Sequence, residues 1–134
     1  MGRQRAQTGA MRKLIALLAL SACMQAPAQP GTEGIYRLVS INSVPFPARA
    51  TISFATPGLV SGNAPCNSYS GPLTADLPQF ATDGGVMSTE MACDALAAEG
   101  EFFAALAAMT RADISAAQIV LSNPAGGNMV FVQP

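Results

Sequence analysis

Three cysteines are the residues whose type and spacing most clearly suggest chemistry in this sequence. Cys66 and Cys93 lie 27 positions apart, in the segments VSGNAPCNSYSG and MSTEMAC, and Cys23 stands near the N-terminus. Two such thiols can form a disulfide, react as free thiols or hold a metal. The chain has no histidine, and two cysteines alone make a poor zinc site. A disulfide and a reactive pair are the interpretations that remain.

The absence of histidine also excludes several classes of enzyme. Ser-His-Asp and Cys-His catalysis both depend on an imidazole, which is also the usual general base. The only lysine, Lys13, falls in a segment that we expect to be removed. Asp83, Glu90 and Asp94 could be paired carboxylates, but isolated surface acids are commoner. We therefore expect no enzyme, no metal site and no cofactor.

The N-terminal region has the pattern of a secretory signal. From Met11 the chain reads MRKLIALLALSAC, in which two basic residues precede the uncharged apolar run 14–20 and small residues precede Cys23. The run is too short to span a bilayer, which needs roughly 20 residues. We assign residues 1–22 to a signal peptide, and we expect Met11 rather than Met1 to be the true start of the chain.

The residues around Cys23 indicate a lipid anchor. Leu-Ser-Ala-Cys resembles the bacterial lipobox, which implies that Cys23 is diacylated and becomes the mature N-terminus. The next residue is Met24, not aspartate, and this favours the outer membrane, with the protein facing the periplasm. Residues 23–34 are rich in Pro, Ala, Gln and Gly, and predict a flexible tether.

The charges are segregated along the chain. All four basic residues of the first 22 precede residue 14, whereas all eight acidic residues follow residue 30. From Cys23 onward three arginines and eight acids give a formal net charge of −5. An acidic surface argues against nucleic acid as a partner. We expect a monomer whose one predicted partner is the membrane, and the oxidising envelope favours a structural disulfide between Cys66 and Cys93.

The remaining chain predicts several short strands and one helix. Strands are expected at 35–41, 50–55, 59–60, 79–81, 85–88, 119–122 and 129–132, with hairpin turns at 82–85 and 123–128. The alanine-rich run 94–109 predicts a helix with an apolar stripe of Leu96, Phe103, Leu106 and Met109. Residues 35–134 are therefore expected to form a mainly β (α+β) domain. Its small antiparallel sheet would be curled or closed as a barrel, with the helix packed on it.

Two motifs carry a resemblance to a known family. They are Cys66-Asn67-Ser68-Tyr69-Ser70-Gly71, preceded by Val60-Ser61-Gly62, and Thr89-Glu90-Met91-Ala92-Cys93. In order and spacing they resemble the META domain, the HslJ-like family of bacterial lipoproteins. The resemblance implies a β-rich domain with a helix and no catalytic residues. The chain departs from the family pattern at Tyr36, where Trp is usual, and at Pro65, where Gly is usual.

The loop after Cys66 is the candidate binding surface, with Asn63, Asn67 and Tyr69 as its residues. The favoured alternative is that the polar residues satisfy turn backbone and that Tyr69 packs inside. We expect a lipid-anchored envelope protein with a stress-protective or binding role. One alternative is an inhibitor of an envelope or host hydrolase, which would insert residues 63–69 as a rigid loop. Another is a carrier of a small hydrophobic ligand, which would need an apolar cavity.

Overall fold

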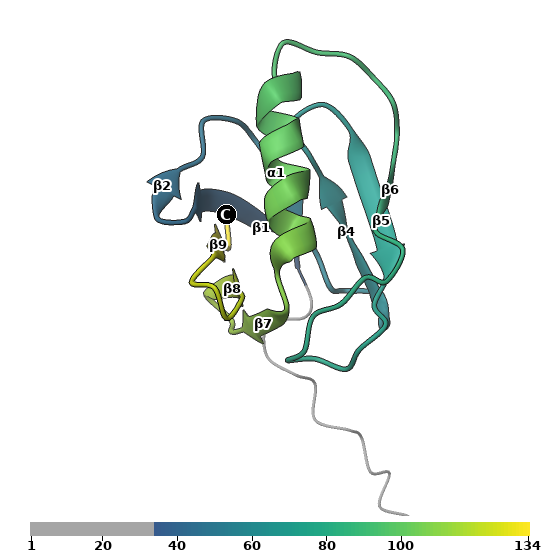
Figure 1. The fold of residues 1–134 in the computed structure, drawn as a ribbon, viewed down its shortest axis with the longest axis vertical. Coiled ribbons are helices and arrows are strands. Elements are labelled where there is room, and N and C mark those ends of the chain that lie inside the picture. Colours follow the sequence, from purple (N-terminus) through teal and green to yellow (C-terminus); the bar gives the residue numbers. More distant parts are fainter. Residues whose placement is uncertain (1–33) are drawn as a thin grey trace, which may run out of the picture.

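A computed structural model describes residues 34–134 of the protein (Figure 1). In chain order the elements are β1 (Tyr36–Ile41), β2 (Val44–Pro45), β3 (Thr51–Ile52), β4 (Leu59–Asn63), β5 (Ser68–Pro72), β6 (Met87–Ser88), α1 (Leu96–Ala108), β7 (Arg111–Ile114), β8 (Gln118–Ser122) and β9 (Asn128–Val132). The expected signal peptide, the lipidation site Cys23 and the tether up to residue 33 lie outside the described residues.

The larger of two antiparallel sheets joins the start of the domain to its end. Its strand order is β2-β1-β9-β8-β7, and β3 also pairs with β1. The register between β1 and β9 shifts between Leu38 and Ser40, which is the mark of a β-bulge. The bulge changes which residues point inward, so that Tyr36, Leu38 and Ile41 are all buried, whereas Ile35 is 58% exposed.

The smaller sheet has the order β4-β5-β6 and meets the larger sheet at one backbone bridge. The Ser53 amide donates to the Ser61 carbonyl at 2.7 Å, and the Ser61 amide donates back at 3.1 Å. The two sheets therefore make direct contact where β3 runs beside β4.

Helix α1 runs in front of both sheets, with the larger sheet on one side and the smaller on the other (Figure 1). Phe102 and Leu106 are buried on its inner face. The ring centroid of Phe102 lies 5.4 Å from that of Tyr69 on β5 and 6.4 Å from that of Phe46. The aromatic contacts hold the helix to the smaller sheet and to the β2 side of the larger one.

The predicted fold class is confirmed: the domain is mainly β, antiparallel, with a helix in the last third of the chain. The barrel alternative is wrong for the described residues, because the larger sheet ends at β2 and β7 and these strands do not pair. Within residues 34–134 no helix is long and apolar enough to cross a bilayer.

Three local predictions are wrong. The hairpin of 79–81 with 85–88 does not form, because β6 pairs with β5, while the Phe80 amide donates to the Thr110 carbonyl at 2.9 Å. Segments 68–72 and 111–114, where no strand was expected, are strands β5 and β7. The strand expected at 50–55 is regular only at Thr51–Ile52, since Ser53 leaves β1 to bridge β4.

Candidate functional site

A groove of about 730 Å³ opens between the start of β1 and the tip of the β4–β5 hairpin. We call it the hairpin groove. Ile35, Arg37, Arg49 and Thr51 line one side, residues 63–68 line the second, and Thr89 and Met91 line the third, with Pro134 also at its border. The groove thus combines two cations with hydroxyl, amide and apolar groups.

Strand alternation places the two arginines on one wall. Arg37 lies opposite Thr51 in the β1–β3 pair, and Arg49 precedes Thr51 by two residues. Arg49 lies before β3, but the backbone pairing continues to Ala50 and Arg49 is exposed, so that it lies on the same face as Thr51, diagonally from Arg37. Between them the Leu38 amide donates to the Ala50 carbonyl at 2.9 Å, which fixes the register. The side chains of Leu38 and Ala50 point the other way and are buried.

Thr51 joins this wall to the hairpin. Its carbonyl accepts a hydrogen bond of 2.7 Å from the Tyr69 hydroxyl, and its Oγ1 accepts one of 2.9 Å from the Asn63 amide. Gly62 makes the approach of the two strands possible, because a Cβ at this position would overlap the Thr51 carbonyl. Tyr69 is buried, and burial raises its pKa, since the phenolate would be poorly solvated there.

Asn67, at the hairpin tip, uses its full hydrogen-bonding capacity. Its Nδ2 donates to the Glu99 Oε1 at 2.6 Å and to the Met91 carbonyl at 3.0 Å. Its Oδ1 accepts from the Met91 amide at 2.6 Å and from the Thr89 hydroxyl at 2.9 Å. An amide side chain can make four such bonds, and here all four are made. The side chain therefore ties the tip both to the segment that follows β6 and to the helix.

Glu99 holds the tip from inside. Its side chain is 6% exposed, and Oε2 accepts the backbone amides of Cys66 at 2.7 Å and Asn67 at 2.9 Å. Hydrogen bonds to an ionised acceptor are roughly twice as strong as neutral ones. In the turn of the hairpin these two amides have no backbone hydrogen-bond acceptor, and the carboxylate takes its place.

The predicted disulfide between Cys66 and Cys93 is present, with Cα atoms 5.7 Å apart. It fastens the hairpin tip to the residues that lead into α1, which begins two residues after Asp94 with Ala95 as its N-cap. No side chain caps the helix, and the Thr89 hydroxyl is engaged by Asn67. The tip is therefore fixed covalently and by buried hydrogen bonds.

The three residues of the candidate binding loop have different surroundings. Asn63 is exposed and its side chain accepts a hydrogen bond of 3.0 Å from the Ser68 hydroxyl. Asn67 is 5% exposed and Tyr69 is 3% exposed. Only Asn63 of the three has an exposed side chain, although Asn67 also lines the groove.

Arg37, Arg49 and Glu99 belong to the site but were not predicted from the sequence. For Arg37 the alternation with Tyr36 and Leu38 was a usable signal, because it places a cation on the outer face of a half-buried strand. No comparable signal links Arg49 to it. Glu99 stands in the first turn of α1, where an acid is ordinarily explained by the helix dipole. Its burial depends on amides 32 and 33 positions earlier. Glu99 is buried, whereas Leu96, which was expected on the apolar stripe, is 48% exposed.

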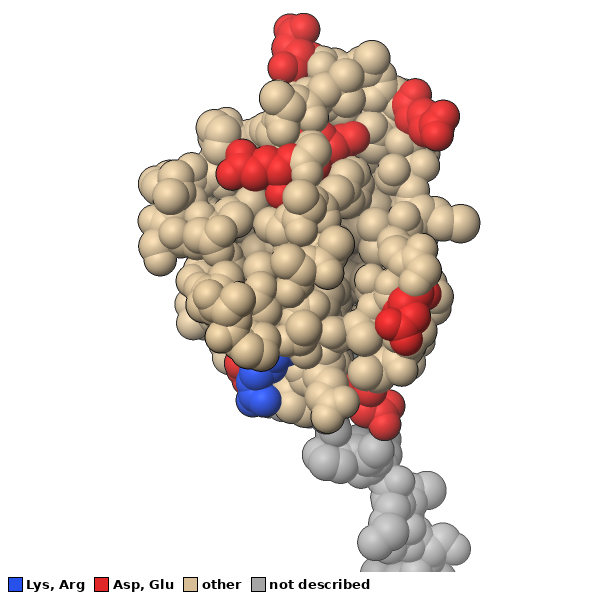
Figure 2. Space-filling view, in the orientation of Figure 1, with Lys and Arg blue, Asp and Glu red and all other residues tan. Residues whose placement is uncertain are grey.

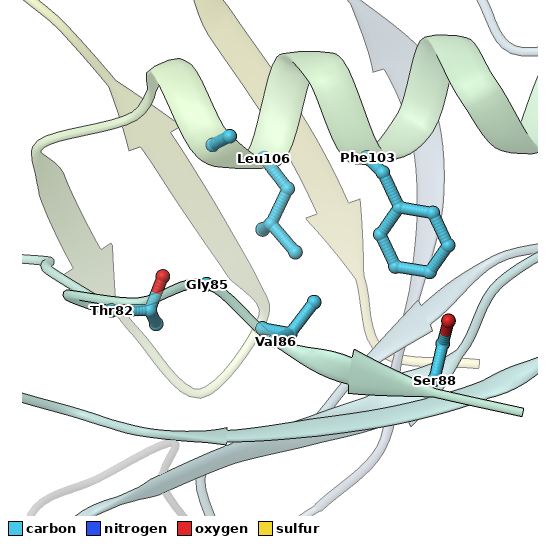
Figure 3. Close-up of a pocket in the computed structure, with 7 residues that line it drawn as sticks. Thr82, Gly85, Val86, Ser88, Phe103 and Leu106 are labelled. Carbon is cyan, nitrogen blue, oxygen red and sulfur yellow. The ribbon is translucent and has the colours of Figure 1, made fainter.

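A second, smaller cavity of about 310 Å³ lies between α1 and the segment before and within β6 (Figure 3). Leu106 and Phe103 of the helix point down towards Val86, and the hydroxyls of Thr82 and Ser88 flank them (Figure 3). We call it the helix pocket. Its lining is mostly apolar and contains no charged side chain.

The charges outside the groove form no site. On the face shown in Figure 2 acidic side chains are scattered over the surface and little positive charge is visible. In residues 34–134 the one ion pair joins Arg111 to Asp113 at 2.8 Å. No group of three Cys, Asp or Glu side chains in that range is placed to hold a metal.

Two antiparallel sheets bridged at β3 and β4, with a helix packed across them and a disulfide at the hairpin tip, define the class of domain. The chain belongs to the META domain family, which matches residues 29–134. The match begins inside the stretch that the sequence assigns to the tether. A solved structure, described as the NMR structure of the protein from Burkholderia xenovorans, has a TM-score of 0.59 and 17% identity. The alignment covers 100% of this chain and 99% of that one, and it supports the fold alone. No curated protein sequence matches the chain.

Proposed function

We propose that the protein is a lipid-anchored component of the bacterial cell envelope whose META domain is a non-catalytic binding module with a stress-protective role. The observation that carries the binding role is the hairpin groove, whose second wall is held by the disulfide and by the bonds of Glu99 and Asn67. A site that is formed before its ligand arrives avoids the entropic cost of ordering a loop.

The anchor is proposed from the sequence. Leu-Ser-Ala-Cys at residues 20–23 supports acylation of Cys23, and two or more acyl chains suffice for stable attachment to a membrane. Outer-membrane sorting is proposed from Met24. A tether of about ten residues would hold the groove close to the membrane surface.

Mass spectrometry of the protein isolated from bacterial membranes tests the anchor. The expected result is a mature N-terminus at Cys23 whose mass carries acyl chains, and recovery in the outer-membrane fraction. Cys23→Ser is the control and should abolish the acyl mass. An N-terminus at another residue, or an unmodified Cys23 in the protein from membranes, would refute the anchor.

A carrier of a small hydrophobic ligand is the second candidate, and the helix pocket is the observation that favours it. A neutral apolar dye such as 1-aminoanthracene should bind there, and Ala107→Phe, which fills the pocket, should reduce its affinity at least tenfold. Equal binding by the variant would end this candidate. The inhibitor alternative has no such support, because residues 64–67 are held against the domain on both sides.

A further inference from the structure

The cations of the domain are concentrated in the hairpin groove. Residues 34–134 contain three arginines against seven acidic residues. Two of the three, Arg37 and Arg49, line the groove, and the third, Arg111, is paired with Asp113 on β7. No Asp or Glu of the described residues lines the groove. In an acidic domain this makes the groove the local site of positive charge, which attracts anions.

The two guanidinium groups are free to engage a ligand. Both residues are exposed, and neither forms an ion pair with a described residue. They extend from the same face of the β1–β3 pair as diagonal neighbours. Guanidinium groups bind carboxylate and phosphate oxygens through two parallel hydrogen bonds. Two such groups on one face suit one oxyanion, and the Thr51 hydroxyl in the same lining, which accepts a bond from the Asn63 amide, can donate a further bond.

Apolar side chains border the same groove. Met91 is 64% exposed and Ile35 is 58% exposed, and both line it. They are two of the few large apolar side chains that residues 34–134 expose, and each costs free energy while it contacts water. A methionine is also well suited to contacts with flexible chains, because its own side chain is unbranched and polarizable.

We propose that the hairpin groove binds amphiphilic anions. An oxyanion head, either carboxylate or phosphate, lies between Arg37 and Arg49, and the apolar part of the ligand covers Met91 and Ile35. The volume of about 730 Å³ falls in the range of sites for small ligands. The inference rests on the proposed binding role and names the ligand class for it. It does not depend on the lipid anchor.

Titration of residues 24–134, exported so that the disulfide forms, tests the proposal. The probes are dodecyl phosphate and dodecanoate, each below its micellar concentration, and isothermal calorimetry measures their binding. Arg37→Gln with Arg49→Gln should weaken binding at least tenfold, and added salt should weaken it as well. The matched control Arg111→Gln should leave the affinity within twofold. Met91→Ser should weaken dodecyl phosphate several-fold but leave the weak binding of inorganic phosphate unchanged.

Two results would overturn the proposal. One is dodecyltrimethylammonium binding as tightly as dodecyl phosphate, since the charge of the head would then play no part. The other is an arginine double variant that folds, by circular dichroism, and binds as the parent does. Failure of the proposed lipid anchor can be distinguished from failure of this proposal. The anchor is tested by the mass of the protein from membranes, and its absence would not affect these titrations.

Vesicles distinguish the two sources of such a ligand. The groove would be assigned to a lipid headgroup if the protein is retained on phosphatidylglycerol vesicles but not on phosphatidylcholine vesicles, and if this retention depends on Arg37 and Arg49. Binding of free dodecyl phosphate without retention on vesicles would assign it to a soluble amphiphile. If the protein neither binds dodecyl phosphate nor is retained on phosphatidylglycerol vesicles, the proposal is overturned.

Discussion

At the scale of single residues, Glu99 and Asn67 organise the site. A buried carboxylate is costly unless its oxygens are hydrogen-bonded, and here both oxygens have partners from the hairpin tip. None of these partners is a cation. The carboxylate accepts hydrogen bonds from backbone amides, and the side-chain amide of Asn67 is hydrogen-bonded in turn to the backbone of Met91.

Replacing Glu99 by Gln should destabilise the domain by about 2–3 kcal/mol, because hydrogen bonds to a charged acceptor are the stronger ones. The amide must also point its NH₂ group either at two backbone amides or at the NH₂ group of Asn67. Urea unfolding measures the change. Glu101→Gln is the matched control, since this helix acid is exposed, and it should stay within about 0.5 kcal/mol. Equal effects of the two changes would contradict the role given to Glu99.

Tyr69→Phe should cost about 1 kcal/mol at neutral pH, because the bond to the Thr51 carbonyl is lost. Its effect should also depend on pH. Burial raises the pKa of Tyr69 in the folded state, whereas in the unfolded chain it is about 10. The folded state therefore keeps this proton longer, and its contribution to stability is full below pH 10 and is lost as the pH rises further.

The alkaline loss of unfolding free energy should accordingly be steeper in the parent than in Tyr69→Phe. Denaturant titrations between pH 8 and pH 11, about the ordinary tyrosine pKa, provide the measurement. Tyr36 is present in both proteins and cancels in the difference. Parallel pH profiles would show that Tyr69 ionises as it would in water.

At the scale of elements, the contact between β3 and β4 joins the two sheets. The bridge of Ser53 with Ser61 and the bonds of Thr51 cross this contact, and Gly62 allows the backbones to approach. The first wall of the hairpin groove stands on β1 and β3, and the second on β4 and β5. The relative position of the two walls thus depends on this contact.

Two glycine substitutions should have opposite signs. Gly62→Ala should destabilise by about 1–3 kcal/mol, since the new methyl group overlaps the Thr51 carbonyl and the strands must separate. Gly100→Ala should stabilise by about 0.5–1 kcal/mol, because Gly100 lies within α1 and nothing lies within 4 Å of an added Cβ. Thermal unfolding by circular dichroism decides both. A neutral Gly62→Ala would mean that β3 and β4 are not in close contact.

At the scale of the whole molecule, the sequence predicted the fold class, the disulfide and the last hairpin. The β8–β9 hairpin was predictable because two apolar runs flank a turn of Asn, Pro and Gly residues. Strand β5 was not, because the sequence SYSGP lacks strand propensity and is held by pairing on both sides. Strand β7 is short and follows the helix directly, so that only its pairing with β8 defines it.

The candidate site was predictable in location but not in composition. The cysteine spacing drew attention to the loop at 63–69, and the groove does lie beside it. Asn67 and Tyr69 were expected either to bind or to support the loop, and both are buried. Arg49 and Glu99 could not be assigned, because their roles arise from contacts between segments far apart in the chain. Periodicity reports the face of an element and not what that face meets.

The hairpin tip is held rigidly from inside, and this makes the groove a preformed site. Amide hydrogen exchange at Cys66 and Asn67 tests it most directly, because both amides donate to Glu99 and to no strand partner. Loop amides without such partners exchange quickly, whereas those that open only with the whole domain exchange slowly. If the tip is rigid, these two amides should exchange as slowly as those of β8. Exchange as fast as that of exposed Gly84, whose amide donates to no partner among the described residues, would contradict it.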